Sequence, residues 1–265
     1  MRIFTVDSFT DQPFKGNPAA VCLLDSVRSD EWMQALASEM RHSETAFVLD
    51  QGDGLPRSLR WFTPAVEVAL CGHATLATAH VLYSTGAASG AIEFSTKSGI
   101  LTTEQLDHGY ISMDFPAYMP IEISLSDVLA EALGASVVWV GMGRLDILAE
   151  VESEQVVRTL RPDIDALAAL DARAVCVTAR AEESSSGVHY VSRFFAPNAG
   201  VSEDPVTGSA HCMLGPYWSA KLGEKDLVGA QLSQRGGLVR TSVRDGDRVK
   251  ISGTATTIWS GTLHV

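Results

Sequence analysis

Glu44 is the residue whose type and surroundings best suit proton transfer. It lies in Ser43-Glu-Thr-Ala-Phe-Val48, where a single carboxylate interrupts small and apolar residues. Apolar neighbours disfavour the ionised form of a carboxylate, which is what a general acid or base requires. The alternative is an ordinary helix cap or a surface glutamate, and this segment alone leaves both interpretations open.

Two apolar segments begin with glycine and carry polar side chains at their starts. Gly72 is followed by His73, and Gly208 is followed by Ser209. If both segments are helices, their first N–H groups and the positive ends of their dipoles point outward. Two such termini facing one cleft would bind a small carboxylate. The alternative is that each glycine only eases a tight turn.

Asp204, Pro205 and Thr207 stand just before the second glycine. Proline suits a first helical turn and aspartate the cap before it, so Asp204 has a structural explanation as an N-cap. Ser209 also has a structural explanation, as a hydroxyl in the first turn of the helix. Both residues are also candidates for contacting a substrate held at the helix start.

Motifs for metals and cofactors are not found in the sequence. His73 and His80 lie seven residues apart, but no carboxylate completes a ligand set with them, so we expect no metal site. Gly141-Met-Gly143 has only two of the three glycines of a dinucleotide loop, and there is no G-x-x-x-x-G-K-[ST]. We therefore expect no cofactor. The lack of G-x-S-x-G argues against an ordinary serine hydrolase.

The elements that must position these residues alternate between strands and helices, which predicts a mixed α+β fold. Ser29 is a suitable N-cap for an amphipathic helix over Asp30–Met40. The segment Gly72–Tyr83 is apolar nearly all round and belongs inside the protein. Strands are predicted at 3–6, 19–24, 46–49, 58–62, 137–140, 175–178 and 190–195, further helices at 125–133, 164–170 and 208–221, and turn-linked strands over 231–265.

The two halves of the chain share a pattern that indicates internal duplication. Arg60-Trp-Phe-Thr-Pro64 is echoed by Arg193-Phe-Phe-Ala-Pro197, and each is followed by a short acidic loop and a glycine-led helix. The second loop is three residues longer. Two related lobes are predicted, with a hinge at the proline-containing segment Phe115-Pro-Ala-Tyr-Met-Pro120.

Composition limits the class of protein. The chain has 265 residues, of which 46% are hydrophobic and 20% charged, as in globular proteins. Its net charge of −12 argues against nucleic acid and acidic membranes as partners, and no window reaches the roughly 18 apolar residues of a membrane span. The first residues lack a signal-peptide pattern, so we expect a cytoplasmic protein. Four scattered cysteines predict buried, reduced thiols without disulfides.

Several segments together resemble the phenazine-biosynthesis PhzF-like family, which shares the two-lobed fold of diaminopimelate epimerase. They extend from the first strand to the final third of the chain. The resemblance implies two similar lobes, 1–115 plus about 256–265 and 116–255, each a curled, mostly antiparallel sheet around a central apolar helix. The matching segments are Gly16-Asn-Pro-Ala-Ala-Val21, Ser43-Glu-Thr-Ala-Phe-Val48, Arg60-Trp-Phe-Thr-Pro64, Cys71-Gly-His-Ala-Thr-Leu76, Arg193-Phe-Phe-Ala-Pro197 and Glu203-Asp-Pro-Val-Thr-Gly-Ser-Ala-His211.

The resemblance also implies roles for individual residues, in a cleft between the lobes and without a cofactor. Glu44 would shuttle a proton between carbon atoms of the substrate. His73, Asp204 and Ser209 fall on the assisting catalytic positions of the family. Residues expected to bind the substrate carboxylate and polar groups are Gly72, His73, Thr207, Gly208 and Ser209.

One departure separates this chain from the racemases of the same fold, which use two opposed cysteines. Cys71 precedes Gly72, but Thr207 precedes Gly208, so two-thiol racemisation is disfavoured and Cys71 is expected to be a packed small hydrophobe.

We therefore expect a cofactor-independent isomerase that moves a proton, and with it a double bond, within a small carboxylic acid, in phenazine or related secondary metabolism. A homodimer is expected from the relatives. The alternatives are a racemase, epimerase or dehydratase of an amino or hydroxy acid, and a non-catalytic protein that binds small acids.

Overall fold

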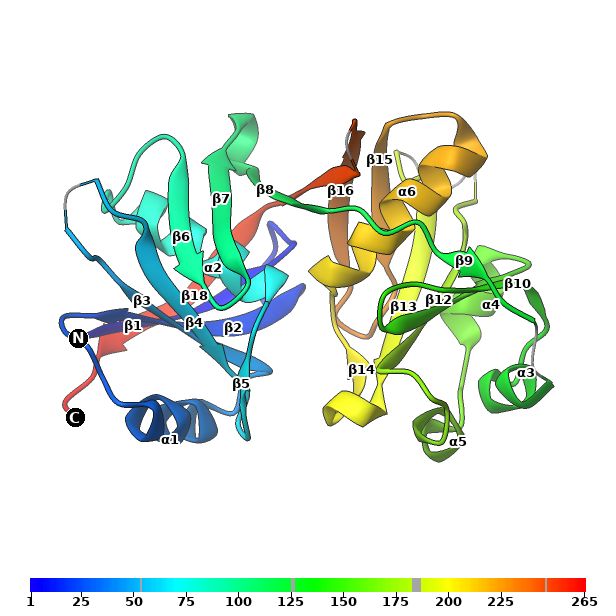
Figure 1. Cartoon of the computed structure of the whole chain (residues 1–265), viewed down its shortest axis with the longest axis horizontal. Helices are drawn as coiled ribbons and strands as arrows, with labels where there is room; N and C mark the ends of the chain where they lie inside the picture. The colour runs from blue at the N-terminus through cyan, green and yellow to red at the C-terminus, as the bar shows by residue number, and fades with distance from the viewer. Residues whose placement is uncertain (53, 125–126, 183–186, 246) are drawn as a thin grey trace. The chain divides into compact units, whose positions relative to one another are not determined.

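The computed structural model describes residues 1–52, 54–124, 127–182, 187–245 and 247–265. Over these residues the chain forms two units (Figure 1). The first is Met1–Phe115 together with Ser252–Val265, and the second is Pro116–Ile251. The chain thus returns to the first unit at Ser252, slightly earlier than the predicted residue 256. The predicted hinge segment begins inside a strand, because Phe115 and Pro116 end β8.

The first unit is a largely antiparallel sheet with two helices. β1 pairs antiparallel with β2 and β18, β2 pairs parallel with β3, and β3 pairs antiparallel with β4. β4 then pairs antiparallel with β5 and parallel with β6. The strands are β1 Arg2–Ser8, β2 Asn17–Leu24, β3 Glu44–Leu49, β4 Arg57–Phe62, β5 Glu67–Val68, β6 Ile92–Thr96, β7 Gly99–Gln105, β8 Ile111–Pro116 and β18 Ala255–Thr262.

Helix α1, Asp30–Met40, makes the crossover between the parallel strands β2 and β3. Its predicted bounds and its N-cap are confirmed, because the Ser29 side chain accepts a hydrogen bond from the backbone N–H of Trp32. The helix buries Met33 and Leu36 in a cluster with Phe47. A crossover of this kind fixes where β3, and therefore Glu44, begins.

Helix α2, Gly72–Ser84, is the central apolar helix of the first unit, as predicted. It contacts β1, β2, β3, β7 and β18. Its first eight residues are all buried, and the hydroxyls of Thr75 and Thr78 donate to the carbonyls of Cys71 and Ala74 at 2.6 and 2.7 Å. These bonds satisfy hydroxyls that would otherwise be buried without partners.

The second unit repeats this plan. β10 pairs antiparallel with β11, β11 parallel with β12, β12 antiparallel with β13, and β13 antiparallel with β14 and parallel with β15. The predicted duplication is therefore seen as the same order of strand pairings. Its strands are β9 Ile121–Glu122, β10 Val137–Met142, β11 Asp146–Val151, β12 Ala174–Arg180, β13 Tyr190–Ala196, β14 Val201–Asp204, β15 Asp226–Gln231, β16 Gly237–Arg244 and β17 Arg248–Gly253.

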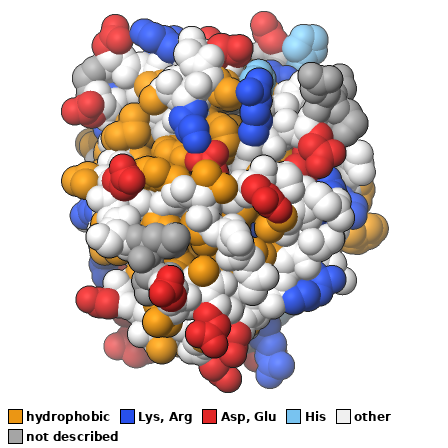
Figure 2. Space-filling model, turned by 90° about the vertical axis from the view of Figure 1, so that its right-hand side faces the viewer, with side chains coloured by type: hydrophobic (Ala, Val, Ile, Leu, Met, Phe, Trp, Pro, Cys, Tyr) orange, Lys and Arg blue, Asp and Glu red, His pale blue; other side chains and the backbone are white. Residues whose placement is uncertain are grey.

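The helices of the second unit include α3 Asp127–Leu133, α4 Glu154–Thr159, α5 Ile164–Ala168 and α6 His211–Leu222. The start predicted for the first of these, residue 125, lies outside the described residues. None of the helices in the described part of the chain has the length and apolarity that a membrane span needs. Figure 2 looks onto one end of this unit, where apolar side chains gather toward one side of the face, with acidic and basic side chains among and around them.

The apolar helix predicted over 208–221 differs at its start. Gly208–Ala210 forms a 3₁₀ turn, η3, and the α-helix begins at His211. The Thr207 carbonyl bonds the backbone N–H of Ala210 and the His211 ring at 2.9 Å, so it does not take the usual α-helical donor. The alternative explanation of Asp204 as an N-cap does not hold, because Asp204 ends β14 and Pro205 lies outside the helix.

The repeated arginines confirm the duplication at the level of side chains. Arg60 binds Glu67 through two hydrogen bonds of 2.7 Å, and Arg193 binds Glu203 through bonds of 2.7 and 2.9 Å. Each guanidinium also lies over the phenylalanine two residues further along its strand. The partners are 7 and 10 residues apart, which is the three-residue difference in loop length.

Candidate active site

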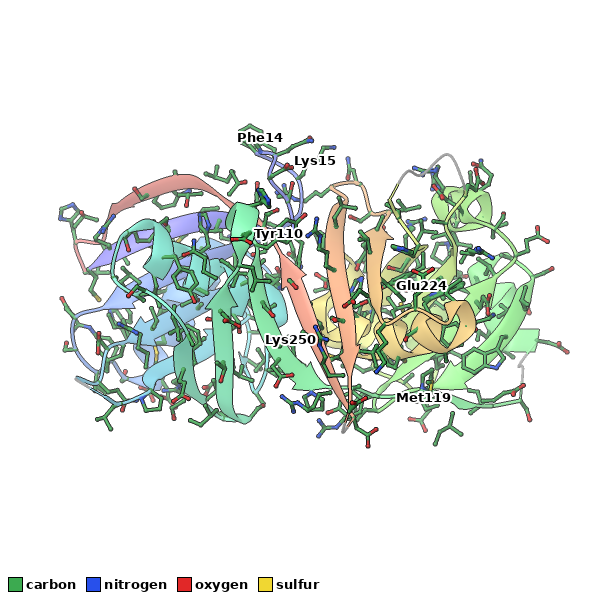
Figure 3. The ribbon with its side chains drawn as sticks, turned by 90° about the horizontal axis from the view of Figure 1, so that it is seen from above. Phe14, Lys15, Tyr110, Met119, Glu224 and Lys250 are labelled. Carbon is green, nitrogen blue, oxygen red and sulfur yellow. The ribbon has the colours of Figure 1, made fainter. Side chains whose placement is uncertain are left out.

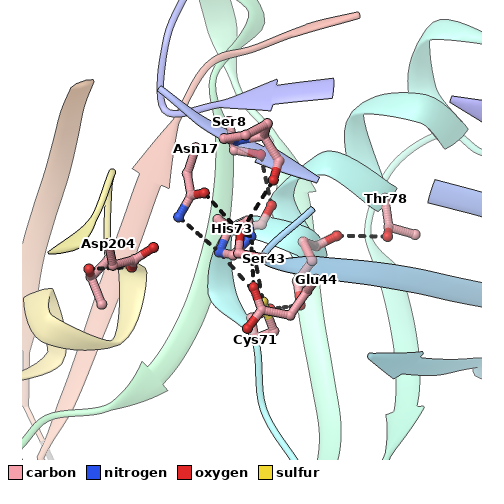
Figure 4. A network of polar contacts seen from close by, with 12 residues as sticks. Ser8, Asn17, Ser43, Glu44, Cys71, His73, Thr78 and Asp204 are labelled. Atoms are coloured by element: carbon pink, nitrogen blue, oxygen red, sulfur yellow. Dashed lines mark hydrogen bonds and ion pairs between the residues drawn. The ribbon is translucent and has the colours of Figure 1, made fainter. Parts of the chain in front are cut away.

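Glu44 occupies the first position of β3 and pairs with Ala19 across the parallel strands. Its side chain is 18% exposed, and its Oε2 atom lies 3.2 Å from Nε2 of His73 (Figure 4). Among the described residues, this buried oxygen makes no hydrogen bond of good alignment. Glu44 is therefore a half-buried carboxylate beside an imidazole, rather than a helix cap or a surface residue.

His73, the second residue of α2, is buried and held on both ring nitrogens. Nε2 faces Glu44 and lies 3.4 Å from Oγ of Ser43. Nδ1 lies 3.3 Å from the Asn17 amide nitrogen. Ser8 donates a hydrogen bond of 2.8 Å to the His73 backbone carbonyl. Contacts from β2, from β3 and from the residue before β3 thus fix the ring, while β1 fixes the backbone of His73.

The charge state of the pair differs from the sequence-based expectation. Burial raises the pKa of Glu44, but the charge of His73 and the close polar contacts with His73, Ser43 and Cys71 outweigh it, so the pKa lies below its ordinary value. The expectation that the ionised form is disfavoured is therefore wrong. The expectation considered only the segment around Glu44, whereas His73, whose charge lowers the pKa, lies 29 residues away in the sequence.

The pKa of His73 moves in the opposite direction. Burial lowers it, but the neighbouring Cys71 and Glu44 raise it well above its ordinary value. Of these two neighbours, Glu44 carries the charge at neutral pH, because burial raises the pKa of the Cys71 thiol to about 11. At neutral pH the pair is therefore an imidazolium beside a carboxylate.

Cys71 is buried, as predicted, but it is more than a packed hydrophobe. Its Sγ atom lies 3.5 Å from Nδ1 and 4.0 Å from Nε2 of His73. The donor atoms of Glu44, Cys71 and His73 all lie within 4.8 Å of one another. The expectation of no metal site considered only His73 with His80, whereas the structure groups His73 with Cys71 and with a carboxylate from β3. His80 instead bonds the Thr257 hydroxyl at 3.0 Å.

The loop between β1 and β2 places Ser8 and Asn17 opposite each other at its base. Gly16 has a φ of +65°, and a Cβ there would lie 2.1 Å from the Ser8 carbonyl oxygen. Only glycine fits this close approach. Asp7 accepts a 2.7 Å hydrogen bond from the Phe14 backbone N–H, and Figure 3 shows Phe14 at the outer end of the loop.

The candidates of the second unit gather around η3. The Thr207 hydroxyl donates a short hydrogen bond to the Asp204 carboxylate. Buried Gln231 accepts from the Thr207 N–H at 2.9 Å and donates to the Asp204 carbonyl at 2.7 Å. Gly208 is buried and Ser209 half-buried in the 3₁₀ turn. This arrangement presents an ordered aspartate next to a helix start.

The structure thus brings the predicted residues together in two groups. Glu44, Gly72 and His73 belong to the first unit, whereas Asp204, Thr207, Gly208 and Ser209 belong to the second. Sequence reasoning overlooked four polar partners of these groups. Asn17 and Ser43 lie in the motifs already quoted, adjacent to Gly16 and Glu44, whereas no sequence signal marks the other two. The four are Ser8, Asn17, Ser43 and Gln231.

Known proteins resemble this chain over nearly its whole length. The family described as "Phenazine biosynthesis-like protein" matches residues 6–261. The chain is 47% identical over 259 residues to an uncharacterized isomerase of Halalkalibacterium halodurans, covering 97% of this chain and 96% of that protein. It is 48% identical over 266 residues to an uncharacterized isomerase of Pseudomonas aeruginosa, covering 100% and 99%.

Solved structures show the same likeness. A PhzF-family phenazine biosynthesis protein of Enterococcus faecalis superposes with a TM-score of 0.94 at 39% identity, covering 100% of this chain and 99% of that one. A hydroxyproline epimerase of Agrobacterium vitis shares the fold alone, with a TM-score of 0.64 at 10% identity over 98% and 91% of the chains. The two-unit α+β architecture is therefore the epimerase-like fold that the sequence predicted.

Proposed function

We propose that this chain, which belongs to the phenazine biosynthesis-like PhzF family, is a cofactor-independent isomerase that moves a proton within a small carboxylic acid. The observation that carries the proposal is the Glu44–His73 pair, a carboxylate with one poorly satisfied oxygen, 3.2 Å from an imidazole at the start of a buried helix. Relatives named as isomerases support the general class of reaction.

In the proposed mechanism, Glu44 removes a proton from one carbon of the substrate and returns it to another, shifting a double bond. Its lowered pKa keeps the carboxylate ionised and able to accept the proton at neutral pH. A carboxylate of low pKa is a weak base, so the substrate C–H must itself be acidified. Backbone N–H groups that stabilise the negative charge developing on the substrate would make this C–H bond more acidic.

Helix α2 offers such groups in the first unit. The N–H groups near Gly72 and His73 lie in the first turn of a 13-residue helix, where no intrahelical acceptor is available. The Cys71 side chain makes no capping hydrogen bond at this end. We propose that these N–H groups bind the substrate carboxylate or the negative charge that develops on the substrate.

We assign the second-unit residues the roles that the family resemblance suggests. Asp204, held by Thr207 and Gln231, orients a polar group of the substrate. Ser209 adds a hydrogen bond, and the N–H groups of Gly208 and Ser209 bind a substrate oxygen. The homodimer expected from the resemblance stays a prediction.

The chemistry of Cys71 argues against two-thiol racemisation. Burial raises the pKa of this thiol to about 11, so it is protonated at neutral pH, and the matching position of the second unit is Thr207. Two-thiol racemisation needs a thiolate at one position to remove the proton and a thiol at the other to return one, and Thr207 supplies neither. A dehydratase or a non-catalytic acid-binding protein could use the same candidate residues, so experiment must separate these alternatives from the isomerase.

The proposal is tested by incubating the protein with a panel of small cyclic and acyclic acids in deuterated water. We expect mass gain and a shifted double bond in at least one acid with wild-type protein, and neither with Glu44→Gln. Loss of water from an acid would indicate a dehydratase. Thermal stabilisation by an acid without exchange would favour a binding protein.

A further inference from the structure

We propose that Glu44, Cys71 and His73 form a binding site for a thiophilic divalent cation such as Zn²⁺, and that occupancy of this site blocks the proton transfer proposed above. The donor set of one carboxylate, one thiolate and one imidazole is of the type that Zn²⁺ binds. The inhibitory consequence rests on the proposed function, whereas the binding does not.

The distances between the donor atoms bring three ligands near one cation position. Zn–N, Zn–O and Zn–S bond lengths place a nitrogen and an oxygen ligand about 3.3 Å apart, and a nitrogen and a sulfur about 3.6 Å apart. The observed separation of His73 Nε2 and Glu44 Oε2 is 3.2 Å, so this pair already fits. Cys71 Sγ lies 3.5 Å from Nδ1 and 4.0 Å from Nε2, beside the imidazole ring, so the Cys71 side chain must rotate about its Cα–Cβ bond to reach a cation held by Nε2 and Oε2.

The backbone that carries Cys71 and His73 is already held in place. Cys71 and His73 flank Gly72 at the start of α2, and the Thr75 hydroxyl fixes the Cys71 carbonyl while Ser8 fixes that of His73. A cation therefore does not have to order a loop in order to bind. This arrangement lowers the entropic cost of assembling the ligands.

The outer contacts also fit a metal-bound histidine. A ligating imidazole usually directs its second nitrogen to a hydrogen-bonding partner, which fixes the ring. With Nε2 on the cation, Nδ1 faces the Asn17 amide at 3.3 Å, and the amide oxygen can accept its proton once the amide is rotated. Three protein ligands leave the fourth tetrahedral position to water or to a ligand.

The ligand types select among cations. A thiolate and an imidazole favour Zn²⁺, Co²⁺ or Cd²⁺, whereas Mg²⁺ and Ca²⁺ require several oxygen ligands. On binding, the cation displaces the thiol proton of Cys71 and one proton of the His73 imidazolium into solvent. The ionised Glu44 and the resulting Cys71 thiolate then balance its charge of two. Coordination occupies the Oε2 atom that the mechanism uses as a base, so the bound cation and the migrating proton exclude each other.

The test is a titration of the purified full-length protein with Co²⁺, which reports thiolate coordination by its charge-transfer absorption. We expect one-to-one binding with this band, displacement by Zn²⁺, loss of the band in Cys71→Ser, and at least about tenfold weaker binding in Glu44→Gln. Cys212, a buried cysteine of the second unit, provides the matched control. We expect Cys212→Ser to leave the charge-transfer band and the affinity for Co²⁺ unchanged. Circular dichroism verifies folding, and Cys71→Ala serves as a second variant.

A band that persists in Cys71→Ser or Cys71→Ala, or equal binding by wild type and Glu44→Gln, overturns the site. Turnover that Zn²⁺ leaves unchanged at saturating occupancy overturns the inhibition. If Zn²⁺ binds as described while no acid exchanges deuterium, the metal site stands and the proposed function fails separately.

Discussion

The Glu44 carboxylate and the His73 imidazole approach to 3.2 Å although they belong to different elements, the first residue of β3 and the second residue of α2. Their side chains are 18% and 7% exposed, so neither charge is well solvated by itself. Each group therefore depends on the other for its ionised form.

This mutual dependence predicts how stability varies with pH. The pKa of Glu44 is depressed, so its contribution is present above its ordinary value of 4.5 and is lost as pH falls through the depressed value. The pKa of His73 is raised, so its contribution is present below 6.5 and is lost as pH rises through the raised value.

We expect the difference in unfolding free energy between wild type and Glu44→Gln to be largest between these two limits and to shrink at both ends. Urea denaturation at a series of pH values measures it. Glu39→Gln, at an exposed position of α1, provides the control. A difference that does not change with pH would contradict the assigned charge states.

Asn17 is expected to act as a positioning residue through His73. Asn17→Ala removes the amide 3.3 Å from Nδ1, so we expect kcat/KM to fall on the order of 10- to 100-fold through loss of alignment. Nitrogen chemical shifts of the His73 ring should change as well, a signal that a purely structural role would leave in place. Unchanged ring shifts together with unchanged activity would remove Asn17 from the site.

Gly16 is expected to be among the least replaceable glycines. Gly16→Ala combines a φ of +65° with a Cβ only 2.1 Å from the Ser8 carbonyl oxygen, and should cost more than about 3 kcal/mol. Gly86→Ala has a φ of +70° but no atom within 4 Å, and should cost about 1 kcal/mol. Chemical denaturation compares the two. Equal losses would show that backbone conformation alone matters at Gly16.

The duplicated arginines should differ in their contribution to stability. Arg193 has a side chain 10% exposed and also donates to the Leu160 carbonyl at 2.8 Å, so Arg193→Ala should cost about 3 kcal/mol. Arg60 is 25% exposed, and Glu67 keeps Lys97 as a partner, so Arg60→Ala should cost about 1 kcal/mol. Denaturant midpoints rank the two variants, and the reverse order would refute this assessment.

Local signals in the sequence predicted most of the fold. Helix α1 matches its predicted bounds because its cap, Ser29, and its apolar face lie within the same segment. The repeated arginine segments revealed the duplication because each is followed by an acidic loop and a glycine-led helix, and in the structure each arginine binds a glutamate of that loop region. The start of α6 was predicted wrongly because the His211 ring takes the Thr207 carbonyl, a contact that propensity does not encode.

The sequence singled out the residues of the candidate site but not their electrostatics. Glu44 and His73 stood out through motif and resemblance, whereas their charge states depend on a 3.2 Å contact between distant segments. Ser8 and Gln231 carried no signal, because their roles come from hydrogen bonds to His73 and Thr207 that only the folded chain creates.

Deuterium exchange by Glu44→Gln tests the central claim most directly. The amide preserves the size of the side chain and removes its ability to accept a proton. With an acid that wild type isomerises in deuterated water, we predict that Glu44→Gln still binds the acid, seen as a thermal shift, but incorporates no deuterium above the uncatalysed rate. Incorporation by Glu44→Gln at a rate near that of wild type would contradict the account.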